Sequence, residues 1–377
     1  MSKNEIRLNF NVKKPILACG ADIKGAFAVA IGRKVYLFGG FGDLGDADNL
    51  SKYRSSIERE WRKLKPALIV CDMHPGYFST RCAEFLFDRA KGIGRLYRVQ
   101  HHEAHIASSI VDQEICGDAI GVAFDGTGFG PDGAIWGGEF FTGGLKGLKR
   151  AAHMEYVPMP GGEIAIKEPW RMAGAYIYSA FGVRSKGISI EYMRRISPDK
   201  WKALTGMIDK KINSPLTSSV GRLFDAVGGM MMPTFSKVAE AEVPIALEKL
   251  ASRDWADRYQ FEISGDRGQT DVKVGKMISG IVKDLSKGVD RSIVSGKFHN
   301  TVAEIVAAVC VKIGKRSRLS KVLLSGGVFQ NRLLSDRASY LLGQRGFDVY
   351  RHLRVDTNDN GIPVGQIAIA NSRVLCA

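Results

Sequence analysis

The chain has 377 residues, of which 45% are hydrophobic, and its formal net charge is +15. This length and composition predict a globular protein with two domains or two lobes. No segment approaches the roughly 18–20 uncharged apolar residues that a membrane-spanning helix needs. Met1 to Lys14 is polar without an apolar core, so it predicts no signal peptide, and we expect a frayed basic arm there.

The six cysteines form no C-x-x-C pair, which argues against a zinc-finger site. Most lie in apolar runs, as is typical of buried free thiols in a reducing compartment, so we expect a cytoplasmic protein without membrane contact. The basic residues are spread along the chain. They are compatible with weak binding of nucleic acid, of phosphorylated metabolites or of an acidic partner, or with a role in solubility alone. The net charge does not distinguish these alternatives.

The first part of the chain predicts an antiparallel meander of three strands followed by alternating helices and strands. We expect strands at 16–19, 26–31 and 34–38, a helix at 51–64, a strand at 67–71, a helix at 81–90, a strand at 94–99, and a further helix that begins near residue 100.

The same order then restarts near Gly117. Strands are expected at 119–124, 134–141 and 148–156, helices from Glu168 onward, later strands at 321–324 and 347–350, and a closing helix at 361–375. This repetition predicts an α/β chain with the duplicated, two-lobed actin-like ATPase (ASKHA) fold, with nucleotide in the cleft between the lobes. We expect lobes at 1–116 and 117–377, a helical insertion at about 187–290, and a last helix that returns towards the first lobe.

A metal site is predicted by Val99-Gln-His-His-Glu-Ala-His105. His101 and His105 lie four residues apart, on one face of the expected helix, and neutral imidazoles bind iron or zinc well. The alternative is one core and one surface histidine. His102 and Glu103 point off that face, and we expect them to support the site or to meet solvent.

Asp125 and Asp359 are the predicted acidic ligands, since each lies at a strand end or glycine turn from which a carboxylate can enter a cleft. The alternative for each is a turn-stabilising aspartate. Through the metal, these two residues are also the best candidates for a catalytic role. Together with the histidines they predict a site for Fe or Zn and for phosphate oxygens.

Glycine-rich segments predict phosphate loops at Gly126, Thr127 and Gly128 and at residues 20–24, with hairpin turns as the alternative. Lys24 is expected either to contact phosphate or to face solvent. Gly221 and Asp225, four residues apart on a helix, are predicted ribose contacts, and the alternative for Asp225 is a position on the helix surface.

Eight segments together resemble the C-terminal carbamoyltransferase region of the hydrogenase maturation factor HypF. They span nearly the whole chain in the expected order and are residues 20–27, 71–81, 99–108, 124–141, 161–173, 217–227, 325–333 and 358–366. The resemblance implies binding of ATP, AMP or carbamoyl-adenylate, with further nucleotide contacts from Gly326, Gly327, Asn331 and Glu240. It also implies transfer of carbamoyl to a cysteine thiol of a HypE-like partner, during maturation of the cyanide ligands of NiFe hydrogenases.

The chain departs from the HypF pattern in several ways. Full-length relatives begin with an acylphosphatase domain, a zinc segment and a domain that makes carbamoyl-adenylate, so we expect a separate protein to supply the adenylate here. Thr357 and Asn360 replace the usual Pro and Gly, and Lys167 replaces the usual Arg. Two alternatives stay open: a tRNA threonylcarbamoyl or small-molecule O-carbamoyltransferase, and a non-catalytic nucleotide-binding scaffold.

Overall fold

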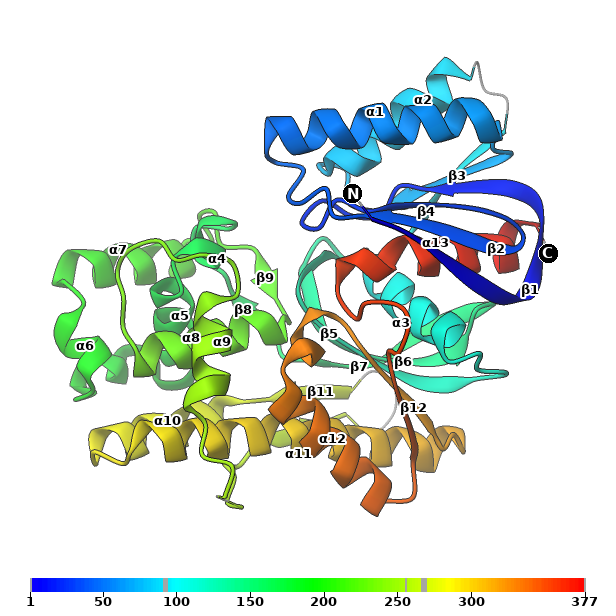
Figure 1. Cartoon of the computed structure of the whole chain (residues 1–377). Coiled ribbons are helices and arrows are strands. Elements are labelled where there is room, and N and C mark those ends of the chain that lie inside the picture. The colour runs from blue at the N-terminus through cyan, green and yellow to red at the C-terminus, as the bar shows by residue number, and fades with distance from the viewer. Residues whose placement is uncertain (1, 91–93, 255, 266–269, 376–377) are drawn as a thin grey trace.

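Two β-sheets form the framework of the computed structural model, which describes residues 2–90, 94–254, 256–265 and 270–375. The first sheet has the order β2-β1-β3-β4, and β3 and β4 run parallel to β1. Its outer face packs on two helices through a cluster that includes Phe27, Tyr53 and Leu86 (Figure 1). The elements of this lobe are β1 (Ser2–Ala18), β2 (Phe27–Gly39), α1 (Ala47–Leu64), β3 (Leu68–Asp72), α2 (Phe78–Arg89), β4 (Arg95–Val99) and α3 (His101–Asp112).

The expectation of a frayed N-terminal arm is wrong. Residues 2–7 pair with residues 34–39 of β2, and Ile6, Leu8 and Val12 are buried. These apolar residues alternate with polar or charged ones, a strand pattern that the polar composition of the segment masks. The two expected strands at 26–31 and 34–38 are also one continuous strand, in which Gly32 adopts φ +62° within an irregularity instead of a turn.

The second sheet begins with the antiparallel meander β5 (Ala119–Phe129), β6 (Ile135–Gly144) and β7 (Gly147–Met154). Strands β12 (Lys321–Ser325) and β13 (Asp348–Arg351) continue it in parallel with β5. On the other edge lie β11 (Thr270–Lys273) and β10 (Glu262–Ser264), and the short β8 (Val157–Pro158) and β9 (Leu216–Thr217) pair beside β6.

Two helices lie between the sheets and contact each other: α3, after β4, and α13 (Ile362–Ala370), after β13 (Figure 1). Apolar residues of both pack against the first sheet, and Ile106 and Ile110 of α3 also pack against β5 and β12. Each lobe thus repeats an antiparallel unit, two parallel strands and a central helix. The predicted two-lobed actin-like fold is confirmed.

The remaining helices cover the far face of the second sheet and extend to one side of it (Figure 1). They already begin at Ile164, and the segment from 187 to 290 also contains β10 and β11. These helices are α4 (Ile164–Lys167), α5 (Trp170–Phe181), α6 (Glu191–Arg195), α7 (Pro198–Asp209), α8 (Val220–Met231), α9 (Glu242–Leu250), α10 (Gly275–Ser286), α11 (Arg291–Ser317) and α12 (Arg332–Gln344).

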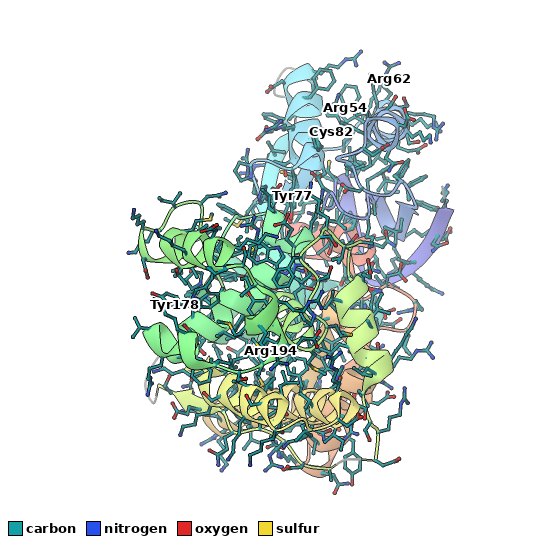
Figure 2. The ribbon with its side chains drawn as sticks, turned by 90° about the vertical axis from the view of Figure 1, so that its left-hand side faces the viewer. Arg54, Arg62, Tyr77, Cys82, Tyr178 and Arg194 are labelled. Carbon is teal, nitrogen blue, oxygen red and sulfur yellow. The ribbon has the colours of Figure 1, made fainter. Side chains whose placement is uncertain are left out.

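Two sequence expectations concern the environment of the chain. Within the described ranges, no helix is both long and apolar enough to cross a membrane. Four of the cysteines are buried free thiols and Cys116 is an exposed one, while Cys376 lies outside the described residues. Of the basic residues, Figure 2 shows Arg54 and Arg62 on the first lobe and Arg194 on the helical part of the second.

Candidate metal centre and nucleotide cleft

Four buried side chains from both lobes converge between the sheets. His101 and His105 come from the first turns of α3, Asp125 from β5, and Asp359 from a short 3-10 turn (Asp359–Gly361) just before α13. The Nε2 atoms of the two histidines lie 3.4 and 3.7 Å from Asp125 Oδ2, and each lies 3.6 Å from Asp359 Oδ1. One ligand atom of each residue lies within 4.8 Å of the others. The folded chain thus brings together the four residues that the sequence predicted as metal ligands.

The donor atoms of this cluster fit a bound cation. Four ligands placed tetrahedrally about 2.0–2.1 Å from zinc or iron leave neighbouring donors roughly 3.4 Å apart, close to the nitrogen–oxygen separations found here. Within the described part of the chain, the Nε2 atoms of His101 and His105 have no hydrogen-bond partner. Buried polar atoms nearly always have a hydrogen-bond partner or a metal ion to bind. Two nitrogens without such a partner, facing two carboxylates, are therefore arranged to donate their lone pairs to a cation.

Asp72, at the end of β3, orients the first histidine, and the sequence analysis did not assign it a role. Its Oδ2 lies 2.8 Å from His101 Nδ1. A carboxylate only accepts, so Nδ1 carries the proton and the lone pair of a neutral imidazole stays on Nε2, towards the cluster. Asp125 is held similarly, because its Oδ1 accepts a 2.9 Å hydrogen bond from the backbone of Gly327. Asp72 could have been found from the sequence, because it lies within residues 71–81, a segment that resembles HypF.

The cluster is electrostatically coupled. Burial alone would lower the pKa of His101, but Asp72, Asp125 and Asp359 raise it well above its ordinary value. The pKa of His105 is raised against burial by Asp125 and Asp359. Burial would raise the pKa of Asp125, and the two imidazoles lower it well below the usual value. Without an ion, protons on the imidazoles balance the carboxylates, so metal binding should displace those protons.

A cavity of about 460 Å³ opens beside the cluster, and Asp125 and Asp359 form part of its wall. Six of the predicted nucleotide-binding residues line it, and so does Lys24, whose Nζ lies 3.6 Å from Glu240 Oε1 across the lobes. Lys24 thus borders the cavity and forms an ion pair there, and its contact with phosphate stays a prediction. The six residues are Gly126, Thr127, Gly221, Glu240, Gly327 and Asn331.

Three other predicted residues do not line this cavity. Gly128 pairs with Trp136 inside the β5–β6 ladder, and its segment is an irregularity of β5 instead of a hairpin turn. Gly326 adopts φ +100°, and a Cβ there would stand 2.2 Å from Phe124 O, so its glycine serves a tight backbone approach. Asp225 is buried within α8, not on a helix surface, and its Oδ2 lies 3.0 Å from Arg222 Nη2.

The two residues that follow His101 in α3 are buried or partly buried. His102 is fully buried against Gly128, and its Nδ1 lies 3.1 Å from Gln100 Nε2, so of its two expected environments the structure excludes solvent. Glu103 forms a 2.6 Å ion pair with Arg373 of the C-terminal segment. Both residues therefore support α3 where it begins.

Two further residues act at the cavity wall and were missed in the sequence. Arg222 lines the cavity directly. His299, on α11, has its Nε2 2.9 Å from Asn331 Nδ2 and its Nδ1 2.8 Å from Ser295 O. Since the carbonyl only accepts, Nδ1 donates to it and Nε2 accepts from Asn331, which fixes the orientation of that amide. Arg222 lies within residues 217–227, a segment that resembles HypF, and this was the available signal for it, whereas His299 has no local pattern that sets it apart from an ordinary helical residue.

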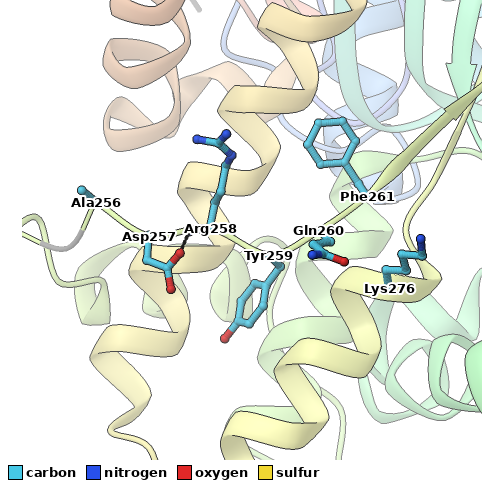
Figure 3. Close-up of a pocket in the computed structure, with 7 residues that line it drawn as sticks. All are labelled: Ala256, Asp257, Arg258, Tyr259, Gln260, Phe261 and Lys276. Carbon is cyan, nitrogen blue, oxygen red and sulfur yellow. Dashed lines mark hydrogen bonds between the residues drawn. The ribbon is translucent and has the colours of Figure 1, made fainter.

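A second cavity, of about 510 Å³, lies between residues 256–261 and Lys276 of α10, and Figure 3 shows its lining. It contains none of the predicted site residues. Its charged groups are engaged by neighbours: Asp257 lies 3.3 Å from Lys297, and Lys276 lies 2.6 Å from Glu262. We therefore place the functional site at the cavity beside the metal cluster.

Comparison with known proteins agrees with this geometry. Residues 11–112 match the family described as the HypF Kae1-like domain, and residues 121–366 match the carbamoyltransferase Kae1-like domain, second subdomain. The chain belongs to the HypF carbamoyltransferase family. It resembles a carbamoyltransferase HypF homolog of Cupriavidus necator, with 31% identity over 94% of this chain and 91% of the relative. The probable carbamoyltransferase HypF of Methanocaldococcus jannaschii is 29% identical over 96% of this chain and 47% of its own length.

Solved structures show the same relationship. A crystal structure of full-length HypF in the phosphate- and nucleotide-bound form matches 98% of this chain and 57% of its own, with a TM-score of 0.88 and 34% identity. HypF of T. kodakarensis matches 98% of this chain and 49% of its own, with a TM-score of 0.85 and 27% identity. This chain therefore spans about half the length of these solved HypF chains and of the Methanocaldococcus relative, and nearly all of the Cupriavidus one.

Proposed function

We propose that this chain transfers a carbamoyl group from carbamoyl-adenylate to a cysteine thiol of a HypE-like partner, in the maturation of the cyanide ligands of NiFe hydrogenases. The observation that carries the proposal is the buried set of two histidines and two aspartates in the wall of a cavity that also contains the predicted nucleotide contacts. Membership in the HypF family supports the choice of the carbamoyl group.

Different residues of the chain would bind the nucleoside and the cation. Gly327 and Asn331 border the part of the cavity where we place the nucleoside, and His101, His105, Asp125 and Asp359 would hold Fe or Zn beside its phosphate. A bound cation would supply Lewis-acid stabilisation of phosphate oxygens. Because both Nε2 atoms are then engaged, neither histidine acts as a general base. The acceptor thiolate forms the new S–C bond directly, and the C–O bond to phosphate breaks as AMP leaves.

We further propose that carbamoyl-adenylate is made outside the region described here and that transfer takes place in the cytoplasm. The support for an outside source is that several HypF relatives extend well beyond the region that this chain matches, for example the Methanocaldococcus protein, of which the chain covers 47%. The four buried free thiols support a reducing compartment.

Mass spectrometry of candidate acceptors tests the transfer. Incubation with synthetic carbamoyl-adenylate should add one carbamoyl group to an acceptor cysteine. ATP with carbamoyl phosphate should add none unless an adenylate-forming protein is present. Asp359→Ala should block transfer while circular dichroism remains native. Transfer from carbamoyl phosphate by this chain alone would refute an outside source of the adenylate. Full transfer by Asp359→Ala would refute a role for the cluster.

Elemental analysis tests the metal site. The purified chain should contain about one iron or zinc ion, and His101→Ala combined with His105→Ala should remove it. His153→Ala is a matched control, because that histidine is buried but pairs with Asp271 on β11, away from the cluster. Unchanged metal in the double variant would contradict the assignment.

A tRNA substrate is the second candidate. The chain is 28% identical to a tRNA N6-adenosine threonylcarbamoyltransferase of Burkholderia thailandensis over 43% of this chain, and its charge is +15. Tight tRNA binding that weakens steeply with salt would favour this substrate over a protein thiol. Nucleotide binding without any transfer would instead favour a scaffold.

A further inference from the structure

Arg222 is a buried cation with unused hydrogen-bond donors in the wall of the nucleotide cavity. The residue is 7% exposed, and an ion pair joins its Nη2 to Asp225 Oδ2 at 3.0 Å. Among the described residues, its Nε and Nη1 atoms have no hydrogen-bond partner. A buried guanidinium with missing acceptors is costly, so the arrangement is incomplete without an additional acceptor.

The backbone holds this side chain next to Gly126 of β5. Ser219, which caps α8, donates to the carbonyls of Asp125 and Gly126 at 2.7 Å and accepts from the backbone of Arg222 at 3.1 Å. A Cβ at Gly221 would lie 2.8 Å from the Cα of Gly126, so the helix and β5 are in close contact. A Cβ at Gly126 would in turn lie 3.7 Å from Arg222 Nη2. The guanidinium therefore lies beside the residue that follows the predicted ligand Asp125.

The other charged groups in the cavity wall are already engaged. Lys24 pairs with Glu240 at 3.6 Å, and Glu248 accepts backbone hydrogen bonds at the start of α12. Asp125 and Asp359 belong to the metal cluster. Arg222 is thus the buried cation of this wall that still has donors to offer, and a guanidinium matches the oxygens of a phosphate in both charge and geometry.

We propose that Arg222 contacts the substrate by binding the phosphate that is joined to the carbamoyl group, and so stabilises AMP as it leaves. This inference rests on the proposed function. The thiol of the acceptor loses its proton to solvent, its sulfur bonds to the carbamoyl carbon, and the carbon–oxygen bond to phosphate breaks. The electron pair of that bond stays on the phosphate oxygen, next to the guanidinium.

Calorimetric titration of the whole chain with AMP and with adenosine separates a phosphate contact from a general loss of binding. The unmodified chain should prefer AMP. Arg222→Gln should reduce that preference about tenfold to a hundredfold, because it removes charge-assisted hydrogen bonds, and should leave adenosine binding unchanged. Arg222→Lys retains the charge but not the paired donors of the guanidinium. Its preference for AMP should lie between those of the unmodified chain and of Arg222→Gln. Asp225→Asn, which removes only the counter-ion, should preserve or increase the preference for AMP.

Each outcome has a distinct meaning. An unchanged ratio of AMP to adenosine affinity in Arg222→Gln, or an equal loss for both ligands, would overturn the role of Arg222. If the unmodified chain binds neither ligand, the nucleotide cleft of the proposed function fails instead. If Arg222→Gln does not fold by circular dichroism, Arg222→Lys decides the matter, since an unchanged ratio in that folded variant overturns the proposal.

Discussion

Replacing Gly365 with alanine should destabilise this chain, although alanine is the better helix former. Gly365 lies inside α13, where propensity alone predicts a gain of about 1 kcal/mol. A Cβ at this position would lie 1.9 Å from Ala104 O and 2.9 Å from Ser108 N, both on α3. Carbon–oxygen contacts need about 3.3 Å, so the central helices would have to separate by about 1.4 Å. We expect a net loss of about 1–3 kcal/mol in the free energy of unfolding.

The same separation should weaken metal binding without changing any ligand. Helix α3 contains His101 and His105, whereas Asp359 directly precedes α13, and metal–ligand distances tolerate only about 0.2 Å. Urea unfolding and competition with a zinc chelator measure the two effects. Gly206→Ala in α7 is the matched control, because a Cβ there meets nothing within 4 Å, and it should stabilise the chain by about 0.5–1 kcal/mol. Equal stability and metal affinity of Gly365→Ala and the unmodified chain would refute the argument.

Three further predictions follow from single contacts. Asp72→Asn should lower metal affinity about 10- to 100-fold by weakening the bond that orients His101, and unchanged affinity in a chelator titration would exclude that role. Burial lowers the pKa of His299 from 6.5 to about 4, so the unfolded chain binds a proton between these pH values and the native chain does not. The contribution of His299 to stability is therefore complete above pH 6.5 and declines towards pH 4. Urea unfolding of the unmodified chain and of His299→Gln measures it: between pH 7 and 4 the unmodified chain should lose about 1–3 kcal/mol of unfolding free energy relative to the variant. A difference that stays constant over this range would contradict the prediction. Asn331→Ala should lower the melting temperature by removing the cap of α12 and should also reduce the shift that AMP produces; a full shift would place the nucleotide elsewhere.

The sequence by itself determined the residues of the candidate metal cluster. His101 and His105 are one helical turn apart, so any helix there presents both imidazoles on one face, and Asp125 and Asp359 stand at the ends of apolar or glycine-rich segments. The short-range pattern of apolar and polar residues was also sufficient to predict most strands and helices, because it too depends only on residues that are close in the sequence. It failed for residues 2–14, where the buried side chains of β1 alternate with polar or charged ones and only pairing with β2 reveals the strand.

Only the tertiary structure decided which residues complete the site. Asp72 at the end of β3 contacts His101 after the neighbouring strand β4, His299 contacts Asn331 from another helix, and Asp225 pairs with Arg222. These contacts join residues that share no local pattern. Secondary structure follows interactions within a few residues, whereas the orientation of a buried polar side chain depends on which distant partner satisfies its hydrogen bonds once the lobes have packed.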